Sequence, residues 1–283
     1  MEEEKEIKQQ SKIPLILSII ILIIGLGGIG WYFIMQQLNK NGIHNLKDKI
    51  IQVEDTPTIS DTPDIDTSLR YYLIHNVVVQ EKYKDIFLEN DDFIGWITID
   101  DTVIDYPVMQ TIDDEQFYLR KNFDKEYSIS GTIFASAACS YERPSENIIL
   151  YGHSMNDGSM FQSIKKYADE DYYKEHKYIQ FDSLVGNGTY EVIAAFSTES
   201  HNKDYEGFDV YKNTNLDHET FTEFTKQCKS FTPYETSDVE YGDELITLST
   251  CAYHTHNGRF VVIAKKISEQ KVDLTKDPIE VID

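Results

Sequence analysis

The longest apolar stretch of the chain lies near its N-terminus. Residues 13–35 form a run of 23 positions without a charged side chain, and about 20 apolar residues suffice for a helix to cross a bilayer. A cleavable signal peptide has a shorter apolar core followed by a small-residue cleavage site, whereas residues 36–40 offer no such site. The pattern predicts an uncleaved transmembrane anchor over 13–35, preceded by a short segment, 1–12.

Polar residues replace the apolar run from position 36 onward. Segment 36–66 contains Pro57, Pro63 and a succession of Asp and Thr residues, a composition that predicts a stalk. Beyond it, apolar residues between Leu69 and Phe87 recur at roughly helical spacing. We therefore expect one or two helices over 67–90, leading into the main domain.

The remaining pattern is one of short apolar segments separated by turns. Two helical patterns, at 159–167 and 217–231, interrupt the series, and Asn187-Gly188 between two segments is a hairpin signal. Many short strands with turns between them favour a closed β-barrel with peripheral helices, a mainly β fold. The predicted strands are 93–99, 103–104, 132–135, 147–152, 178–184, 189–197, 244–250 and 259–267.

These patterns divide the chain into an anchor, a stalk, a main domain and a tail. The main domain is predicted over 67–267, with its barrel over 91–267. The last residues, 268–283, are expected to form a polar tail.

Charge and cysteine content narrow the classes of function. The chain has 26 Lys and Arg against 49 Asp and Glu, a net charge of −23, and nucleic acid binds to basic surfaces, so no nucleic-acid partner is expected. Three cysteines are too few, and odd in number, for a disulfide framework. We expect Cys139 and Cys228 to be buried structural thiols; Cys251 differs because of its neighbours.

One literal match to a dinucleotide-binding motif does not indicate a dinucleotide site. Residues 25–30 fit the pattern G-x-G-x-x-G, but they lie inside the apolar run and lack the strand–turn–helix context that dinucleotide binding requires. Helix packing in the membrane explains these glycines better.

Three side chains at the ends of predicted strands point to acyl transfer. Cys251 ends one strand and Arg259 begins the next, so a hairpin would hold a thiol beside a guanidinium, while His153 follows a third strand. An ordinary thiol, with a pKa of about 8.5, is protonated at neutral pH, and a nearby imidazolium of His153 would favour the thiolate. Arg259 would donate hydrogen bonds to the oxyanion that forms after attack.

These residues also resemble a known family. Tyr151-Gly152-His153, the run Thr247–Cys251 and Arg259 are similar to the signature of sortases, the membrane-anchored cysteine transpeptidases of Gram-positive bacteria. The resemblance covers roughly residues 91–266, and the Thr-Leu-Ser-Thr-Cys form, the N-terminal helices and the helical insertion near 217–231 are typical of class B. Other stretches that fit are Gly95-Trp96-Ile97, Tyr106–Gln110, Ser130–Phe134 and Met160-Phe161.

The resemblance implies an eight-stranded sortase barrel and a reaction. Cys251 would cleave after Thr in a C-terminal sorting signal of the Leu-Pro-x-Thr-Gly kind or a class B variant, forming a thioester. An amine of a peptidoglycan precursor, or of a pilin lysine, would resolve it. Ser249, Thr250 and Tyr151 would line the substrate groove, and neither a cofactor nor a metal is implied.

The resemblance also implies a place in the cell. The chain would be a single-pass protein of the cell membrane, with residues 1–12 in the cytoplasm and the catalytic domain outside. Its partners would be surface proteins that carry sorting signals.

Two positions depart from the class B pattern. Ala135–Cys139 stands where many relatives carry Asp-Tyr-Arg, and Asp105-Tyr106-Pro107 replaces the common Asn-Tyr-Pro. Because both segments bear on the groove, a relative's substrate preference is not transferred to this chain.

Three alternatives remain open from the sequence. Cys251, His254, His256 and His153 could together bind zinc. Water, rather than an amine, could resolve the thioester, or the amine could belong to a pilin, and sequence does not separate these outcomes. Finally, the domain could be a non-catalytic adhesion module on a membrane stalk.

Overall fold

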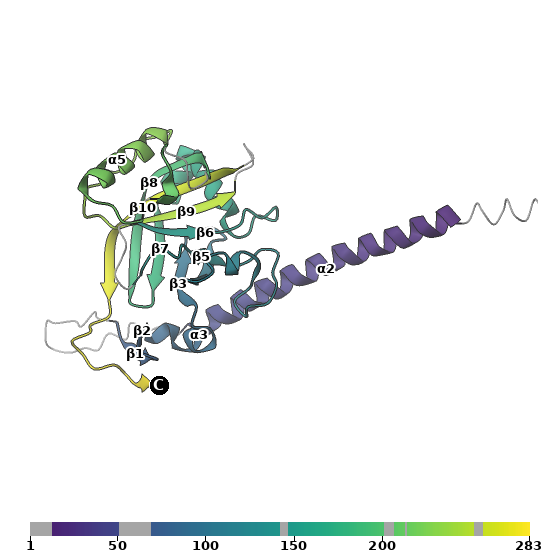
Figure 1. Ribbon diagram of the computed structural model, residues 1–283, viewed down its shortest axis with the longest axis horizontal. Coiled ribbons are helices and arrows are strands. Elements are labelled where there is room, and N and C mark those ends of the chain that lie inside the picture. Colours follow the sequence, from purple (N-terminus) through teal and green to yellow (C-terminus); the bar gives the residue numbers. More distant parts are fainter. Residues whose placement is uncertain (1–12, 51–68, 142–146, 201–206, 213, 252–256) are drawn as a thin grey trace, which may run out of the picture. The chain divides into compact units, whose positions relative to one another are not determined.

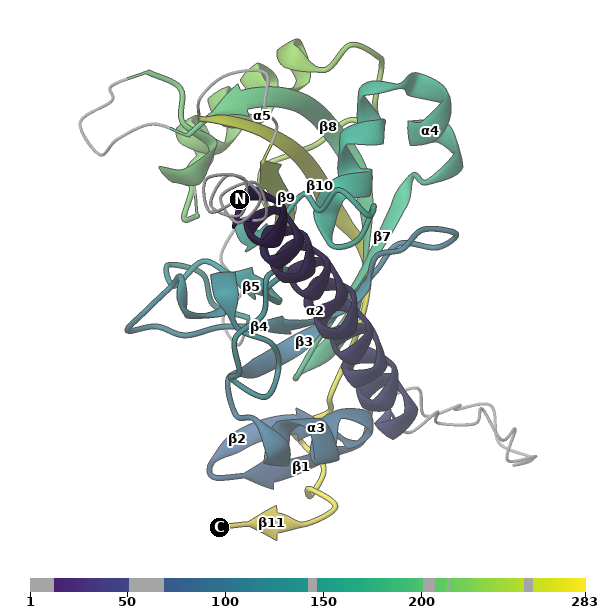
Figure 2. The ribbon, with the colours of Figure 1, turned by 90° about the vertical axis from the view of Figure 1, so that its right-hand side faces the viewer.

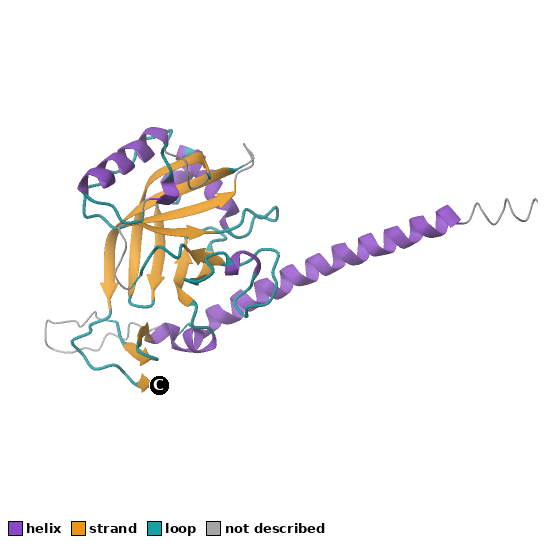
Figure 3. Cartoon of the chain, in the orientation of Figure 1, coloured by secondary structure: helices purple, strands orange, loops and turns teal. Residues whose placement is uncertain are grey.

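Eight strands close into a barrel in the computed structural model of the chain (Figures 1 and 3). The structure describes residues 13–50, 69–141, 147–200, 207–212, 214–251 and 257–283. The barrel strands are β3 (Phe93–Thr98), β4 (Asp105–Met109), β5 (Ile133–Ala135), β6 (Asn147–Tyr151), β7 (Tyr178–Ser183), β8 (Gly186–Glu199), β9 (Leu245–Cys251) and β10 (Gly258–Lys271). Their order is β10-β8-β7-β3-β4-β5-β6-β9, with β9 paired to β10. The predicted eight-stranded barrel is therefore confirmed.

Strands β6 and β9 form the part of the barrel that carries the predicted site residues. They pair in parallel, with Leu150 opposite Leu248. Every residue of β9 from Leu245 to Thr250 is buried, as expected for a strand covered on both faces. The hydroxyl of Thr247 donates to the side-chain oxygen of Asn147 over 2.8 Å, so the buried polar atoms at the start of this pair are satisfied.

Helix α5 (His218–Phe231) covers one side of the barrel next to β8 (Figure 2). The Asp217 side chain accepts a hydrogen bond from the backbone N–H of Thr220 and caps the helix. Phe221, Phe224 and Cys228, at helical spacing, pack into one buried cluster with residues of β8 and β10. The other helices of the barrel are η2 (Phe117–Arg120), η3 (Phe161–Ala168), α4 (Glu170–Glu175) and η4 (Val210–Lys212). The helix predicted over 159–167 is the 3₁₀ helix η3.

The segment before the barrel differs from its predicted structure. Helices were expected over 67–90, but β1 (Tyr71–Ile74) and β2 (Val77–Gln80) form an antiparallel hairpin there. Among the described residues of this segment, η1 (Glu81–Tyr83) and α3 (Lys84–Glu89) are the helical parts. The turn residues His75 and Asn76 both have positive φ, 47° and 67°, as a two-residue type I′ turn requires.

The predicted polar tail is also structured. Strand β10 extends to Lys271, and β11 (Val281–Ile282) pairs in parallel with β1. The Tyr71 hydroxyl donates to the carbonyl of Lys276 over 2.8 Å. The tail therefore adds a third strand to the hairpin, in a small sheet of order β11-β1-β2.

The helix α2 (Ile13–Lys49) contains the predicted anchor and continues past it. Among the described residues, it is the one helix long and apolar enough to span a membrane. Residues 36–49, expected to be stalk, are helical, while 51–66 lie outside the described residues. In the unit formed by residues 45–283, Leu46 is buried and Lys49 pairs with Glu89.

One predicted turn and one predicted strand lie at other positions in the structure. Asn187 and Gly188 are within β8, and the β7–β8 turn is Leu184-Val185. Leu184 is fully buried and its carbonyl accepts from the backbone of Gln80, so tertiary contacts fix the turn there. The strand predicted at 103–104 begins instead at Asp105.

Candidate active site

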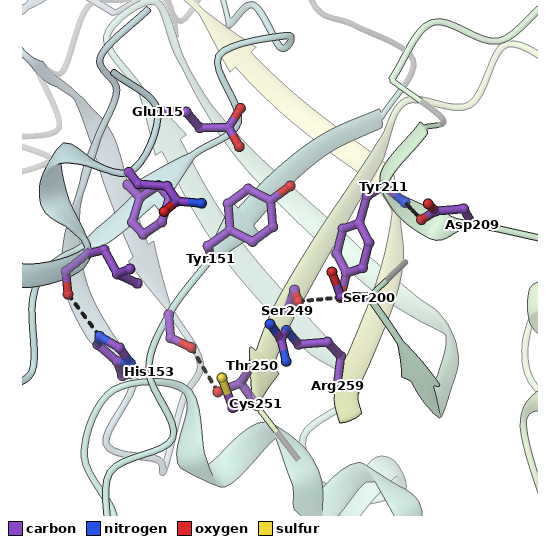
Figure 4. Close-up of a pocket in the computed structure, with 14 residues that line it drawn as sticks. Glu115, Tyr151, His153, Ser200, Asp209, Tyr211, Ser249, Thr250, Cys251 and Arg259 are labelled. Carbon is purple, nitrogen blue, oxygen red and sulfur yellow. Dashed lines mark hydrogen bonds between the residues drawn. The ribbon is translucent and has the colours of Figure 1, made fainter. Parts of the chain in front are cut away.

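A cavity of about 300 Å³ contains all six residues that the sequence nominated. Cys251, His153 and Arg259 line it together with Ser249, Thr250 and Tyr151 (Figure 4). In Figure 4 the thiol of Cys251 is drawn between the imidazole of His153 and the guanidinium of Arg259. Segments about 100 positions apart in the chain thus converge on one open site.

Cys251 and Arg259 owe their proximity to the register of the β9–β10 pair. They are direct antiparallel partners, and the side chains of such partners lie on the same face, with Cβ atoms about 4.5–5.5 Å apart. The Nη1 atom of Arg259 donates to the carbonyl of Gly258 over 3.0 Å, which uses one of its five N–H donors. The other donors leave the guanidinium able to bind an anion next to the thiol.

His153 follows β6 directly, and its neighbour Gly152 fixes its path. A Cβ at Gly152 would meet side-chain atoms of Ile133 and Phe161 at 2.6 Å, so only glycine fits there. The Nε2 atom of His153 lies 2.8 Å from the carbonyl oxygen of Leu119. Because a carbonyl oxygen only accepts, Nε2 carries the proton and Nδ1 has a free lone pair in the neutral ring.

The surroundings of His153 determine which protonation state its imidazole favours. Burial, the largest cause, lowers the pKa of His153 below 6.5, the charge of Arg120 lowers it further, and the hydrogen bond to Leu119 opposes both. The lowered pKa favours the neutral imidazole in the free site, whereas the sequence analysis expected an imidazolium beside the thiolate. A neutral ring with Nδ1 free is suited to accept a proton.

The hydroxyl groups of Ser249 and Thr250 form hydrogen bonds with other groups of the protein. Ser249 Oγ lies 2.8 Å from the hydroxyl of Tyr211, and Thr250 donates to the carbonyl of Gly152 over 2.8 Å. Both serine and threonine are 2% exposed. Thr250 thereby ties the strand that bears Cys251 to the residue before His153.

Tyr151 and Tyr211 form an aromatic wall of the cavity. Their ring centroids are 6.0 Å apart. Burial raises the pKa of Tyr211 to about 12, whereas the bond to Ser249 and the charge of Arg259 act in the opposite direction. Burial also raises the pKa of Tyr151, with the charge of Glu115 as the next cause. Both phenols are therefore neutral hydrogen-bonding groups at pH 7.

Several cavity residues were not predicted from the sequence. Glu115 comes from the loop after β4, and Asp209 and Tyr211 come from the segment between β8 and α5. No spacing motif connects these loops to the catalytic strands. Only their position in the folded chain brings them to the site.

The two other cysteines are where the sequence predicted them, whereas two of the four residues of the zinc alternative lie outside the described structure. Cys139 and Cys228 are free and buried, as predicted. Among the described residues, no group of three or more His, Cys, Asp or Glu side chains is arranged to hold a metal ion. His254 and His256 lie outside the described residues.

Comparisons with known proteins agree with this geometry. The family described as Sortase domain matches residues 97–267. Sortase B of Listeria monocytogenes is 33% identical over 196 residues, which are 69% of this chain and 77% of the relative. Sortase B of Staphylococcus aureus is 32% identical over 199 residues, 68% of this chain and 78% of the relative.

Solved structures of sortase B superpose on most of the chain. The S. aureus sortase B–substrate complex gives a TM-score of 0.68 at 25% identity, covering 85% of this chain and 100% of the other. Sortase B from B. anthracis in complex with AAEK1 gives 0.66 at 28% identity, covering 83% and 99%. On its sequence, its barrel and its cleft, the chain belongs to the sortase family and is a class B sortase, a cysteine transpeptidase.

Proposed function

We propose that Cys251 is the nucleophile of this transpeptidase, with His153 as its acid–base partner and Arg259 as the oxyanion donor. The observation that carries the proposal is the shared cavity, in which a thiol and a guanidinium are direct cross-strand partners and an imidazole lies at the same site. Sortases act on substrates that carry a sorting signal, so the electrophile is a peptide carbonyl of such a signal.

The first step transfers a proton from the thiol of Cys251 to Nδ1 of His153. The resulting imidazolium still donates through Nε2 to the carbonyl of Leu119, a bond that favours the charged ring. The Leu119 carbonyl therefore both orients the imidazole and stabilises the form that catalysis generates.

The thiolate then attacks the carbonyl carbon of the substrate. A C–S bond forms and the carbonyl π electrons move to oxygen, which becomes an oxyanion. Arg259 donates to that oxygen and keeps its charge throughout the cycle. Collapse of the intermediate breaks the C–N bond, and His153 Nδ1 gives its proton to the departing amine, leaving a thioester on Cys251.

An acceptor amine completes the cycle. The amine attacks the thioester carbon, His153 takes the proton from the amine nitrogen, and the sulfur of Cys251 leaves as thiolate. In this proposal the substrate is a surface protein with a C-terminal sorting signal, cleaved after Thr. The acceptor is an amine of a peptidoglycan precursor or a pilin, and the catalytic domain works outside the cell, anchored by α2.

A nucleophile-competition assay tests the proposal. The full-length chain in detergent is incubated with a peptide containing Leu-Pro-Gln-Thr-Gly, with and without hydroxylamine or triglycine. We expect these amines to divert the acyl group from water into a hydroxamate or a longer peptide, and Cys251→Ala or His153→Ala to abolish cleavage. Full cleavage by either variant would contradict the role assigned to that residue.

The same assay addresses hydrolysis as the second candidate. If water and not an amine is the true acceptor, the hydrolysed peptide remains the main product at saturating amine concentrations.

A further inference from the structure

Glu115 places a negative charge in the cleft, away from the catalytic residues. Its side chain is half-buried and lines the same cavity as Cys251. In Figure 4 the carboxylate lies beyond Tyr151 from the thiol, at the other end of the drawn site. Neither the acid–base steps nor the oxyanion described above use this group.

The carboxylate of Glu115 is held by one of its two oxygens. Oε2 accepts from the hydroxyl of Ser136 and from the backbone N–H of Ala137, both over 2.9 Å. No described residue forms a salt bridge with Glu115 or a hydrogen bond with Oε1. One acceptor is thus fixed by the protein, and the other is available to a ligand.

The segment that binds Glu115 is held by several hydrogen bonds, and it is the segment that departs from the class B pattern. Gln110 donates to the carbonyls of Ser136 and Cys139 over 2.8 and 2.9 Å. The backbone N–H of Cys139 donates to the carbonyl of Ser136, closing a turn, and the Ser136 N–H donates to Ile149 in the barrel. Ser136 and Ala137 therefore present their two donors from a fixed turn, so Glu115 is pre-organised.

Strand register gives the distance from this carboxylate to the nucleophile. Ser136 pairs with Ile149, which is opposite Thr247 of β9. Thr247 is four residues before Cys251, or about 13 Å along a strand, and two strand spacings of about 4.8 Å separate β5 from β9. The turn that holds Glu115 thus lies on the order of 15 Å from the backbone of Cys251.

This distance decides which part of the substrate can reach Glu115. An attacking amine must approach the thioester carbon to about 3–3.5 Å, so Glu115 does not contact it. An extended peptide advances about 3.3 Å per residue, and a lysine or arginine side chain adds reach. A residue three to five positions from the cleaved bond is therefore the one that lies beside Glu115.

We propose that Glu115 is a specificity-determining residue that binds a lysine or arginine side chain of the sorting signal, outside its Leu-Pro-x-Thr-Gly core and three to five residues from the cleaved bond. The inference rests on the proposed function, because it assumes that the peptide substrate lies along this cleft. The apolar neighbours Leu119, Phe134 and Tyr151 line the cavity with Glu115 and lower the local dielectric, which strengthens the ion pair relative to one on the open surface.

The test measures peptide binding separately from chemistry. Full-length Cys251→Ala protein in detergent is titrated with fluorescent peptides containing a Leu-Pro-Gln-Thr-Gly core and neutral flanks, in which lysine replaces one non-core residue at a time. We expect lysine at one position, three to five residues from the Thr–Gly bond, to tighten binding about three- to tenfold over glutamine there.

Glu115→Gln in the same background is the decisive variant. Its amide oxygen can still accept from Ser136 and Ala137, so the turn is preserved while the charge is removed. The affinity for the lysine peptide should then be about equal to that for the glutamine peptide. Glu115→Lys should reverse the preference toward glutamate at that position. Glu126→Gln, on an exposed residue outside the cavity, controls for the net charge of −23 and should keep the preference.

Two results would overturn the proposal: no position at which lysine binds better than glutamine, or an equal preference in Glu115→Gln. Cleavage of the neutral peptide by the wild-type chain, measured in parallel, tests the proposed function independently. A chain that binds peptides with the expected charge preference but does not cleave them would refute the mechanism and leave the Glu115 assignment standing.

Discussion

At the scale of single residues, the catalytic proposal depends on groups whose geometry is set by strand register. Arg259 lies beside Cys251 because the two are cross-strand partners. His153 has a defined tautomer because Nε2 faces a backbone carbonyl that cannot donate. These constraints come from the backbone, so point substitutions of the side chains test chemistry with little change in fold.

Substitution of Arg259 tests the oxyanion role. We expect Arg259→Ala to lower kcat/KM by about 10²–10³-fold, the usual cost of losing an oxyanion donor. Arg259→Lys should also be poorly active, since an ammonium does not reproduce a planar donor fork. Steady-state peptide cleavage measures both, with the thermal midpoint as a check on folding; a lysine variant as active as wild type would refute the planar requirement.

The pH dependence of cleavage tests the state of His153. Its pKa lies below 6.5 because of burial and the charge of Arg120, so the ring stays neutral as the pH falls past 6.5 and is protonated only below that. We therefore expect the acid limb of kcat/KM below pH 6.5. Arg120→Gln removes a nearby positive charge, raises the pKa of His153, and should move that limb to higher pH.

Arg120→Lys is the matched control, because it keeps the charge and should leave the limb in place. A limb at or above pH 6.5 in the wild type, or one that does not respond to Arg120→Gln, would count against His153 as the proton acceptor.

Sequence patterns identified the three residues proposed to be catalytic, but not the loop residues that share their cavity. Cys251, His153 and Arg259 each stand at the end of an apolar strand within a recognisable motif. Glu115 and Tyr211 come from loops whose positions depend on long-range packing, so no local pattern identifies them. Thr250, expected to line the substrate groove, lines the cavity, and its hydroxyl donates to the carbonyl of Gly152.

At the scale of secondary-structure elements, burial explains which strands could be predicted from the sequence. Barrel strands such as β6 and β9 are nearly continuous apolar runs and were found from sequence. The β1–β2 hairpin was not, because its apolar residues also fit helical spacing and its turn, His75-Asn76, lacks glycine. The strand β11 has only two residues, Val281 and Ile282, which is too short for a periodic signal, and it is held through backbone hydrogen bonds.

Removal of the C-terminal tail tests its structural role. Deleting residues 273–283 removes the backbone bonds from Leu73 to Glu280 and from His75 to Ile282, and the bond from the Tyr71 hydroxyl to Lys276. Each bond contributes about 1 kcal/mol, so we expect a loss of roughly 1–3 kcal/mol in the free energy of unfolding. Thermal unfolding measures the change.

Tyr71→Phe, which removes a single hydroxyl, is the graded control and should lower the thermal midpoint by less. An unchanged midpoint in the truncated chain would mean that β11 contributes nothing to stability.

At the scale of the whole molecule, three features determine how the orientation of the protein in the membrane can be tested. The part of the chain that the structure describes has one helix long and apolar enough to span a membrane, a compact unit over residues 45–283 that holds the candidate active site, and a single thiol that is not buried. Cys139 and Cys228 are enclosed in the fold, so a thiol reagent reports on Cys251 alone.

This cysteine distribution offers a test of orientation. With the catalytic domain outside the cell, a membrane-impermeant maleimide added to intact cells should label the full-length protein once, at Cys251. Cys251→Ala should remain unlabelled under the same conditions. Labelling of wild type only after the cells are lysed would place the domain in the cytoplasm and contradict the proposed location.

The most direct test of the account is the mass of the enzyme during turnover. Full-length protein is mixed with a Leu-Pro-Gln-Thr-Gly peptide, quenched in acid and analysed intact and after digestion. We expect an adduct equal to the peptide fragment ending at Thr, attached to Cys251 and released by hydroxylamine. An adduct on another residue, or cleavage that persists in Cys251→Ala, would contradict the assignment of the nucleophile.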